Sequence, residues 1–267
     1  MRYSGRRTLV GAAVILAGIV GLNFTATDAA ESGNPVPEGE FKTLVEQDAK
    51  NIETMIATGK KGGAANTSKA SRAIKSSALM IAAYAQSRIG SKGADDAKLA
   101  TLRDAAIKVG TAAGKKKFDD AAAGVKALSI AAAADPKASV KKVDLVAAAG
   151  EFDIEELMYQ FKKTSVGGLG IEEEIKAQAK KATITPANAT AMAQRVLIIA
   201  DFCDVIGING GFNAGKPKKA WDDFNKDMRV AAQGLITAAA GKPTAAALQT
   251  AFTKLDSSCV KCHDKFK

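Results

Sequence analysis

The sequence predicts an all-α protein of two tandem four-helix-bundle-like domains that follow an N-terminal signal peptide. Alanine and lysine are abundant, whereas the 267 residues include only six prolines and 5% aromatic residues. This composition favours helices over strands. The chain is long enough for one large domain or two of ordinary size. Apolar residues recur at helical spacing in both halves, which favours two domains, at residues 38–138 and 145–267.

The first 30 residues have the features of a secretory signal peptide. Arg2, Arg6 and Arg7 precede an apolar run from Leu9 to Leu22, and small residues follow it. An uncleaved membrane anchor is the alternative, but the run is shorter than the ~20 residues that span a bilayer. We therefore expect residues 1–30 to be removed on export, to the periplasm or another exported location, leaving no membrane span.

The last predicted helix carries the residues with the clearest chemical meaning. Cys259-Val260-Lys261-Cys262-His263 has the form C-x-x-C-H, in which two thiols form thioethers with haem vinyl groups and the histidine binds iron. The cysteines share an apolar seam with recurring spacings of four and three residues: Leu248, Phe252, Leu255, Cys259, Cys262 and Phe266. We therefore expect one covalent haem c inside the core, with Phe252 and Phe266 beside it and His263 as the proximal iron ligand.

Two other uses of paired cysteines fit the sequence less well. A zinc site needs about four ligands, but the chain offers only Cys203 beyond the motif and no histidine other than His263. A thiol–disulfide switch lies at a strand-to-helix turn, whereas this motif lies near the end of an alanine-rich helix. With a single histidine, the sixth iron ligand is a methionine, a weaker ligand or absent.

Two segments together point to a known family. The C-x-x-C-H motif is followed by Asp-Lys-Phe-Lys at the C-terminus, and Lys219-Ala220-Trp221-Asp222-Asp223-Phe224 precedes the last helix. Over about residues 150–267 the chain thereby resembles the class II cytochromes c, the cytochrome c′ family. The resemblance implies a four-helix bundle that binds haem c, with Trp221 in the haem pocket.

The resemblance also implies a place for the distal side of the haem. In the family the first helix of the bundle supplies it, with a methionine in low-spin members and an apolar residue in high-spin members. The corresponding segment is Phe152–Lys163, where Met158 stands near the position of the ligating methionine and Phe161 shares its predicted helical face. The family often has an arginine one turn earlier, which this chain lacks. Met158 is therefore either the distal ligand or a core residue; an open sixth position, Met192 and Met228 are the alternatives.

Residues 38–138 predict a second bundle without haem. Ala78–Tyr84 parallels Val196–Phe202, which indicates an internal duplication. In this alignment the three haem-binding positions of the motif fall opposite Ala131, Ala134 and Asp135. Because alanine-rich helices also align by chance, an unrelated helical domain is the alternative. The boundary is expected near Asp135-Pro136-Lys137, and Gly62-Gly63 and Gly167-Gly168 predict loops between helices.

These features favour electron transfer by an exported monohaem c-type cytochrome. A five-coordinate haem protein that binds or senses small gases such as nitric oxide is the alternative. In either case the haem-free half could serve as a docking or homodimerisation module. We expect no enzyme, because no second histidine is present for distal acid–base chemistry.

The excess of basic over acidic residues, 38 to 28, bears on the partners of the protein. It can steer docking to an acidic redox partner, or only keep a helical protein soluble. The sequence has no aromatic-interleaved basic motif of the kind that binds nucleic acid. We therefore expect redox partner proteins and no nucleic acid.

Overall fold

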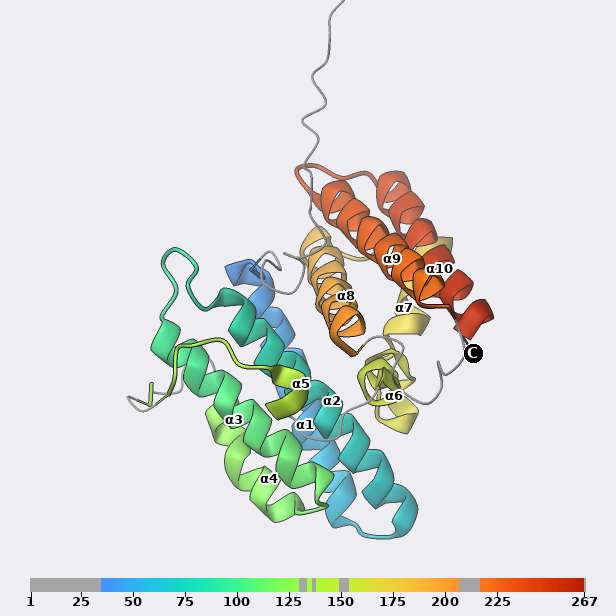
Figure 1. Ribbon diagram of the computed structural model, residues 1–267. Coiled ribbons are helices and arrows are strands. Elements are labelled where there is room, and N and C mark those ends of the chain that lie inside the picture. Colours follow the sequence, from blue (N-terminus) through green and yellow to red (C-terminus); the bar gives the residue numbers. More distant parts are fainter. Residues whose placement is uncertain (1–34, 130–133, 136–137, 149–153, 207–216, 267) are drawn as a thin grey trace, which may run out of the picture.

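Helices form all the regular structure of the described residues (Figure 1). The structure is a computed structural model that describes residues 35–129, 134–135, 138–148, 154–206 and 217–266. The all-α prediction is confirmed. The expected signal peptide lies outside the described residues, as do Pro136 and Lys137 of the expected boundary. In the described ranges, no helix is both long and apolar enough to cross a membrane.

Four helices and a short turn form the first half of the chain: α1 (Glu38–Lys60), α2 (Ala64–Arg88), α3 (Asp96–Gly114), α4 (Phe118–Val125) and the 3-10 turn η1 (Lys126–Leu128). The predicted loop at Gly62-Gly63 is present, with φ of +74° and +81°, values that glycine adopts without strain. α2 is the central helix, packed between α1 and α3. Its residues Ser76–Ala85 are buried on every side, which explains their unbroken run of small and apolar side chains.

The second half contains a bundle of four helices, preceded by short turns. The bundle consists of α7 (Ile171–Lys180), α8 (Pro186–Ile206), α9 (Lys218–Ala239) and α10 (Ala245–Phe266). α9 packs against α8 and α10, and α10 packs against α7. Before the bundle come α5 (Leu145–Ala148), α6 (Ile154–Leu157) and the 3-10 turns η2 (Met158–Phe161) and η3 (Thr164–Val166).

The expected first helix over Phe152–Lys163 is not a continuous helix. Phe152 and Asp153 lie outside the described residues, and from Ile154 the segment forms only α6 and η2 before the chain turns back. Glycines at the predicted Gly167-Gly168 loop permit this turn: a Cβ on Gly168 would lie 2.0 Å from the Lys162 carbonyl oxygen. The amide of Gly170 donates to the same oxygen at 2.8 Å. The first full helix of the bundle is therefore α7.

The sequence alignment of the two halves, which indicates an internal duplication, matches the observed helices for some elements and not for others. Ala78–Tyr84 and Val196–Phe202 both lie in buried helices, α2 and α8. In contrast, Ala134 and Asp135 are not helical, whereas Cys262 and His263 lie within α10; Ala131 lies outside the described residues. The duplication stays a prediction.

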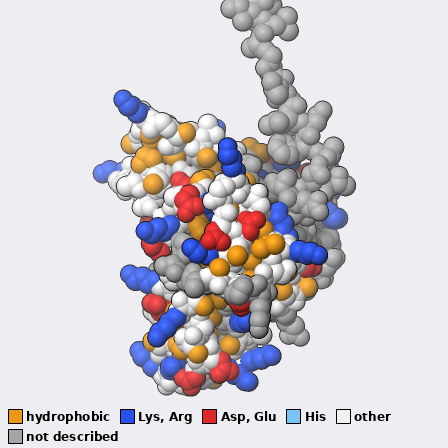
Figure 2. Space-filling view, turned by 90° about the vertical axis from the view of Figure 1, so that its left-hand side faces the viewer, with side chains coloured by type: hydrophobic (Ala, Val, Ile, Leu, Met, Phe, Trp, Pro, Cys, Tyr) orange, Lys and Arg blue, Asp and Glu red, His pale blue; other side chains and the backbone are white. Residues whose placement is uncertain are grey.

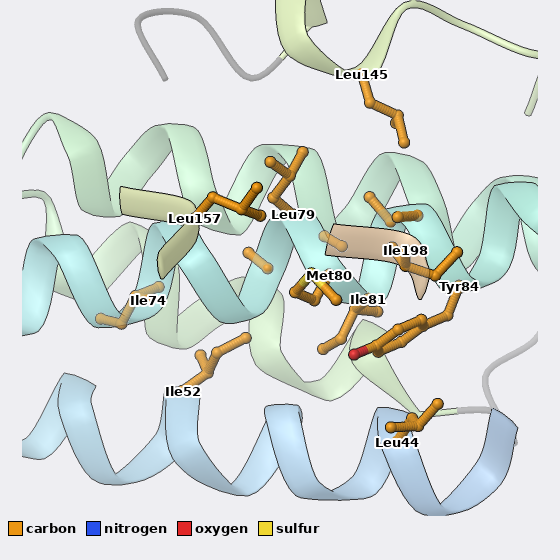
Figure 3. Close-up of a cluster of buried hydrophobic side chains, with 14 of the residues drawn as sticks. Leu44, Ile52, Ile74, Leu79, Met80, Ile81, Tyr84, Leu145, Leu157 and Ile198 are labelled. Carbon is orange, nitrogen blue, oxygen red and sulfur yellow. The ribbon is translucent and has the colours of Figure 1, made fainter. Parts of the chain in front are cut away.

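A shared hydrophobic core joins the two halves. The larger buried cluster combines side chains of α1–α4 with Leu157 of α6, Ile198 of α8 and Trp221 of α9. Figure 3 shows Leu157 and Ile198 over α2, beside Leu79 and Tyr84. α8 contacts α1 and α2 as well as α9. The two halves therefore pack on each other through α8 and α6 rather than standing apart.

A buried ion pair crosses the junction between the halves. Nη1 of Arg195, on α8, lies 2.6 Å from Oδ2 of Asp48, on α1, and the two side chains are 2% and 0% exposed. Arg195 also donates to the side chains of Gln160 and Gln47. Its guanidinium lies 5.6 Å from the centre of the Tyr84 ring. Buried charges are tolerated only with such partners, so these contacts fix how α8 sits on α1.

Asp48→Leu is expected to lower the free energy of unfolding by about 3–5 kcal/mol, because it leaves Arg195 buried without its counter-charge. Urea denaturation of the full chain, followed by circular dichroism, measures the change. Glu46→Gln is the control on the same helix: its partner Lys42 is 3.9 Å away and both side chains are largely exposed, so little effect is expected. Equal losses of unfolding free energy in the two variants would contradict the stabilising role of the buried ion pair.

Candidate functional site

The C-x-x-C-H motif faces a cavity in the second half of the chain. Cys259, Cys262 and His263 of α10 line it together with side chains from η2, α7, α8 and α9. Its volume is about 630 Å³ when the space open to solvent at its mouth is included.

The cavity brings together most of the residues expected to surround a haem. Met158 and Phe161 reach it from η2, and Trp221 reaches it from α9. All three are packed against the shared core. Ile154 and Leu157 of the same segment do not line the cavity and are buried in that core.

Phe252 and Phe266 are not among the lining residues of the cavity. Phe252 is fully buried in a second cluster between α7, α8, α9 and α10. It shares the seam of Cys259 but precedes it by two turns, about 10 Å along the helix axis. Phe266 packs edge-to-face on Trp221 and Phe224, with ring centres 5.3 and 5.8 Å apart. It therefore supports the cavity wall from behind and holds the end of α10 in place.

Several lining residues were not expected from the sequence. They include Glu172 and Ile175 of α7, Phe224 and Asn225 of α9, and Asp256 and Ser258 of α10. The Trp221-x-x-Phe224 spacing is the one signal that could have indicated Phe224. Of the alternative methionines, Met228 lines the cavity, whereas Met192 packs against the second cluster. Met158 and Met228 are thus the two thioethers at the cavity.

The cysteines differ in their surroundings, although none of them forms a disulfide. Cys203 is buried in the wall, where its carbonyl accepts a hydrogen bond of 3.0 Å from Trp221 Nε1. Burial raises the pKa of the Cys259 thiol to about 11 and also raises the pKa of Cys262. Thiol–disulfide catalysts need a lowered thiol pKa. These two thiols are therefore poorly suited to a redox switch.

The alternative of a zinc site gains no support from the structure. Within the described ranges, no group of three or more histidine, cysteine, aspartate or glutamate side chains is arranged to hold a metal ion. A haem iron differs in needing one axial histidine from the motif, because the porphyrin supplies four ligands itself.

A polar network under the cavity ties α9 to α8. Arg229 is paired with Asp201 and Asp204, and Asn225 Nδ2 donates to the Ala200 carbonyl at 3.0 Å and to Asp204. Burial raises the pKa of Asp201, and the charge of Arg229 opposes this shift. Oδ1 of Asn225 is buried and has no partner among the described residues. It leaves one hydrogen-bond acceptor unused on a lining residue.

Comparison of the chain with protein-family models, with curated proteins and with solved structures finds no match. The resemblance of residues 150–267 to the cytochrome c′ family therefore stays a prediction from the motif and the Trp-x-x-Phe segment. What the fold and the cavity define is an all-helical protein in which a C-x-x-C-H motif faces a largely apolar cavity.

Phe266→Ala is expected to lower the free energy of unfolding by about 3 kcal/mol, because it removes a buried ring that packs on Trp221 and Phe224. Phe266→Leu, which keeps most of the apolar volume, should cost less. Thermal unfolding of the full chain measures both. Val260→Ala is the control, since Val260 is 43% exposed on the same helix. A loss from Val260→Ala as large as that from Phe266→Ala would argue against the support attributed to Phe266.

Proposed function

We propose that this protein is an exported monohaem c-type cytochrome that acts in electron transfer. Cys259 and Cys262 would attach the haem through thioethers, and His263 would bind its iron. The observation that carries the proposal is that all three residues of the motif line one cavity, together with aromatic side chains and two methionines.

The residues of the cavity fit a haem. Phe161, Trp221 and Phe224 offer aromatic and apolar surface to a flat ring system. The unused acceptor Oδ1 of Asn225 suits a donor on a bound water. When bound, the haem supplies a one-electron redox centre whose potential depends on its axial ligands and its burial.

The chain's own residues would set these properties. His263 would bind the iron, and Met158 or Met228, which also line the cavity, would be the candidate for a second protein ligand. A methionine ligand raises the potential relative to a second histidine. We favour Met158, because the resemblance to the cytochrome c′ family points to this residue and it lies at the cavity.

Gas binding is the second candidate function. One observation favours it: no lysine, arginine or second histidine is among the described residues that line the cavity. If neither methionine binds the iron, an apolar distal side of this kind favours small neutral ligands such as nitric oxide. Glu172 and Asp256 are the carboxylates at the cavity, and we assign them no catalytic role.

The proposed partners and location follow from the sequence. Residues 1–30 support export, and the excess of basic residues suits an acidic redox partner. On the face shown in Figure 2, lysine and arginine side chains are spread among acidic ones rather than gathered in one patch. We propose no nucleic-acid partner.

Covalent attachment is tested by separating the exported protein under denaturing conditions and staining for haem. We expect the wild type to keep its haem, Cys259→Ala/Cys262→Ala to lose it, and Cys203→Ala to keep it, since thioethers survive denaturation. Haem that dissociates from the wild type, or survives in the double variant, would refute attachment through the motif.

The sixth ligand is tested by optical spectra of the oxidised and reduced holoprotein with and without carbon monoxide. We expect the long-wavelength ferric band of methionine ligation and no response to the gas in the wild type. Met158→Leu should abolish the band and allow gas binding, whereas the control Met228→Leu should leave both unchanged. A high-spin wild-type spectrum that responds to carbon monoxide would instead favour the gas-binding function.

A further inference from the structure

We infer that the haem-free first half of the chain positions one wall of the cavity. The positioning residues are Ser76 and Ser77, which lie in the first half, and Gln160, which lies in the wall. The inference rests on the proposed function in taking the cavity as the haem site. It assigns the first half a role within that site, in addition to any role in docking.

The part of the chain that forms this wall is too short to be a stable structure by itself. Met158 and Phe161 lie on η2, a 3-10 turn of four residues, and α6 before it is equally short. Isolated turns of this length are not stable in water. The chain from Ile154 to Gly167, here called the wall segment, must therefore be fixed by contacts with other elements.

Gln160 provides the central contact. It lies between the two lining residues of η2 and is 2% exposed. Its Nε2 donates to Ser77 Oγ at 3.1 Å and to Ser76 Oγ at 3.3 Å, both on α2. Its Oε1 accepts from Arg195, the partner of Asp48 on α1. Because both ends of its amide are bonded and buried, a shift of η2 would break several hydrogen bonds at once.

Further contacts from α1 and α2 hold the rest of the wall segment. At its start, Lys75 Nζ lies 2.6 Å from Glu156 Oε2, and Ser76 Oγ donates to the Leu157 carbonyl at 3.4 Å. At its end, Asn51 Nδ2 donates to the Gly167 carbonyl at 3.3 Å. The first half thus contacts the wall segment before, within and after η2.

A change on α2 should therefore alter the haem without touching the cavity. Ser76 and Ser77 do not line the cavity, but they hold the residue between Met158 and Phe161. Loss of their hydroxyls would let η2 move and would change the packing or ligation that its side chains provide. Mutations that act through such a contact commonly change a coupled equilibrium by about 0.5–2 kcal/mol.

The test is the reduction potential of the full-length holoprotein carrying Ser76→Ala/Ser77→Ala. We expect the redox equilibrium constant of the haem to change by on the order of 2- to 30-fold. Gln86→Leu is the matched control. Gln86 also lies on α2 and holds a connecting segment, through two hydrogen bonds of 2.9 Å to the backbone of Val143, but it does not contact the wall segment. The redox equilibrium constant of the haem should be unchanged in this control.

An unchanged potential in the double variant, or equal shifts in the double variant and the control, would overturn the inference. If the double variant does not fold, Lys75→Met replaces it, with a smaller shift expected. Amide exchange of Lys162 and Leu169, which donate to η2 carbonyls, gives a readout that does not need haem, and we expect faster exchange in the double variant. If the wild-type protein carries no haem, the proposed function is wrong but the inference about the wall segment is not. If the amide exchange of Lys162 and Leu169 is the same in the wild type and the double variant, the inference is wrong but the proposed function is not.

Discussion

The burial of Arg195 against Asp48 is the constraint on which the arrangement of the whole chain depends. A guanidinium and a carboxylate at 2% and 0% exposure are costly to bury unless they have partners. Those partners come from α1, from η2 and, through the Tyr84 ring, from α2. The same contact that aligns α8 on the first half therefore also fixes Gln160, and with it the wall segment. The polar contacts of Arg195 therefore hold the two halves together and also fix one wall of the candidate site, and they are surrounded by the shared apolar core.

This arrangement gives the first half of the chain a structural role. The second half lacks a long first helix next to the cavity, because α7 is only 10 residues long and η2 is a single turn. α2 packs against η2 and supports it through the hydrogen bonds of Gln160 to Ser76 and Ser77. A bundle that binds a cofactor needs rigid walls, since a loose pocket neither fixes the axial ligand nor excludes water.

The sequence predicts this molecule well where the signal is local. Composition and helical periodicity give the all-α fold, which the structure confirms. The haem indicated by the C-x-x-C-H motif stays a prediction. Periodicity reports the face of a helix but not the position along its axis. Phe252, expected beside the haem, lies two turns before Cys259 and does not line the cavity. The end of the helical segment at Phe161 and the turn that follows depend on the close approach of Gly168 to the Lys162 carbonyl. Gln160 and its partner Ser76 are 84 residues apart in the sequence, and no local pattern indicates such a contact.

The most direct test of this account is whether the two halves unfold together. Trp221, the chain's single tryptophan, reports on the second half through its fluorescence, while far-UV circular dichroism reports on the helices of both. In a urea titration of the full-length protein, we expect the two signals to follow one coincident transition. Loss of a large part of the helical signal while the Trp221 signal stays native would mean that the halves are independent, and would contradict a shared core that supports the cavity.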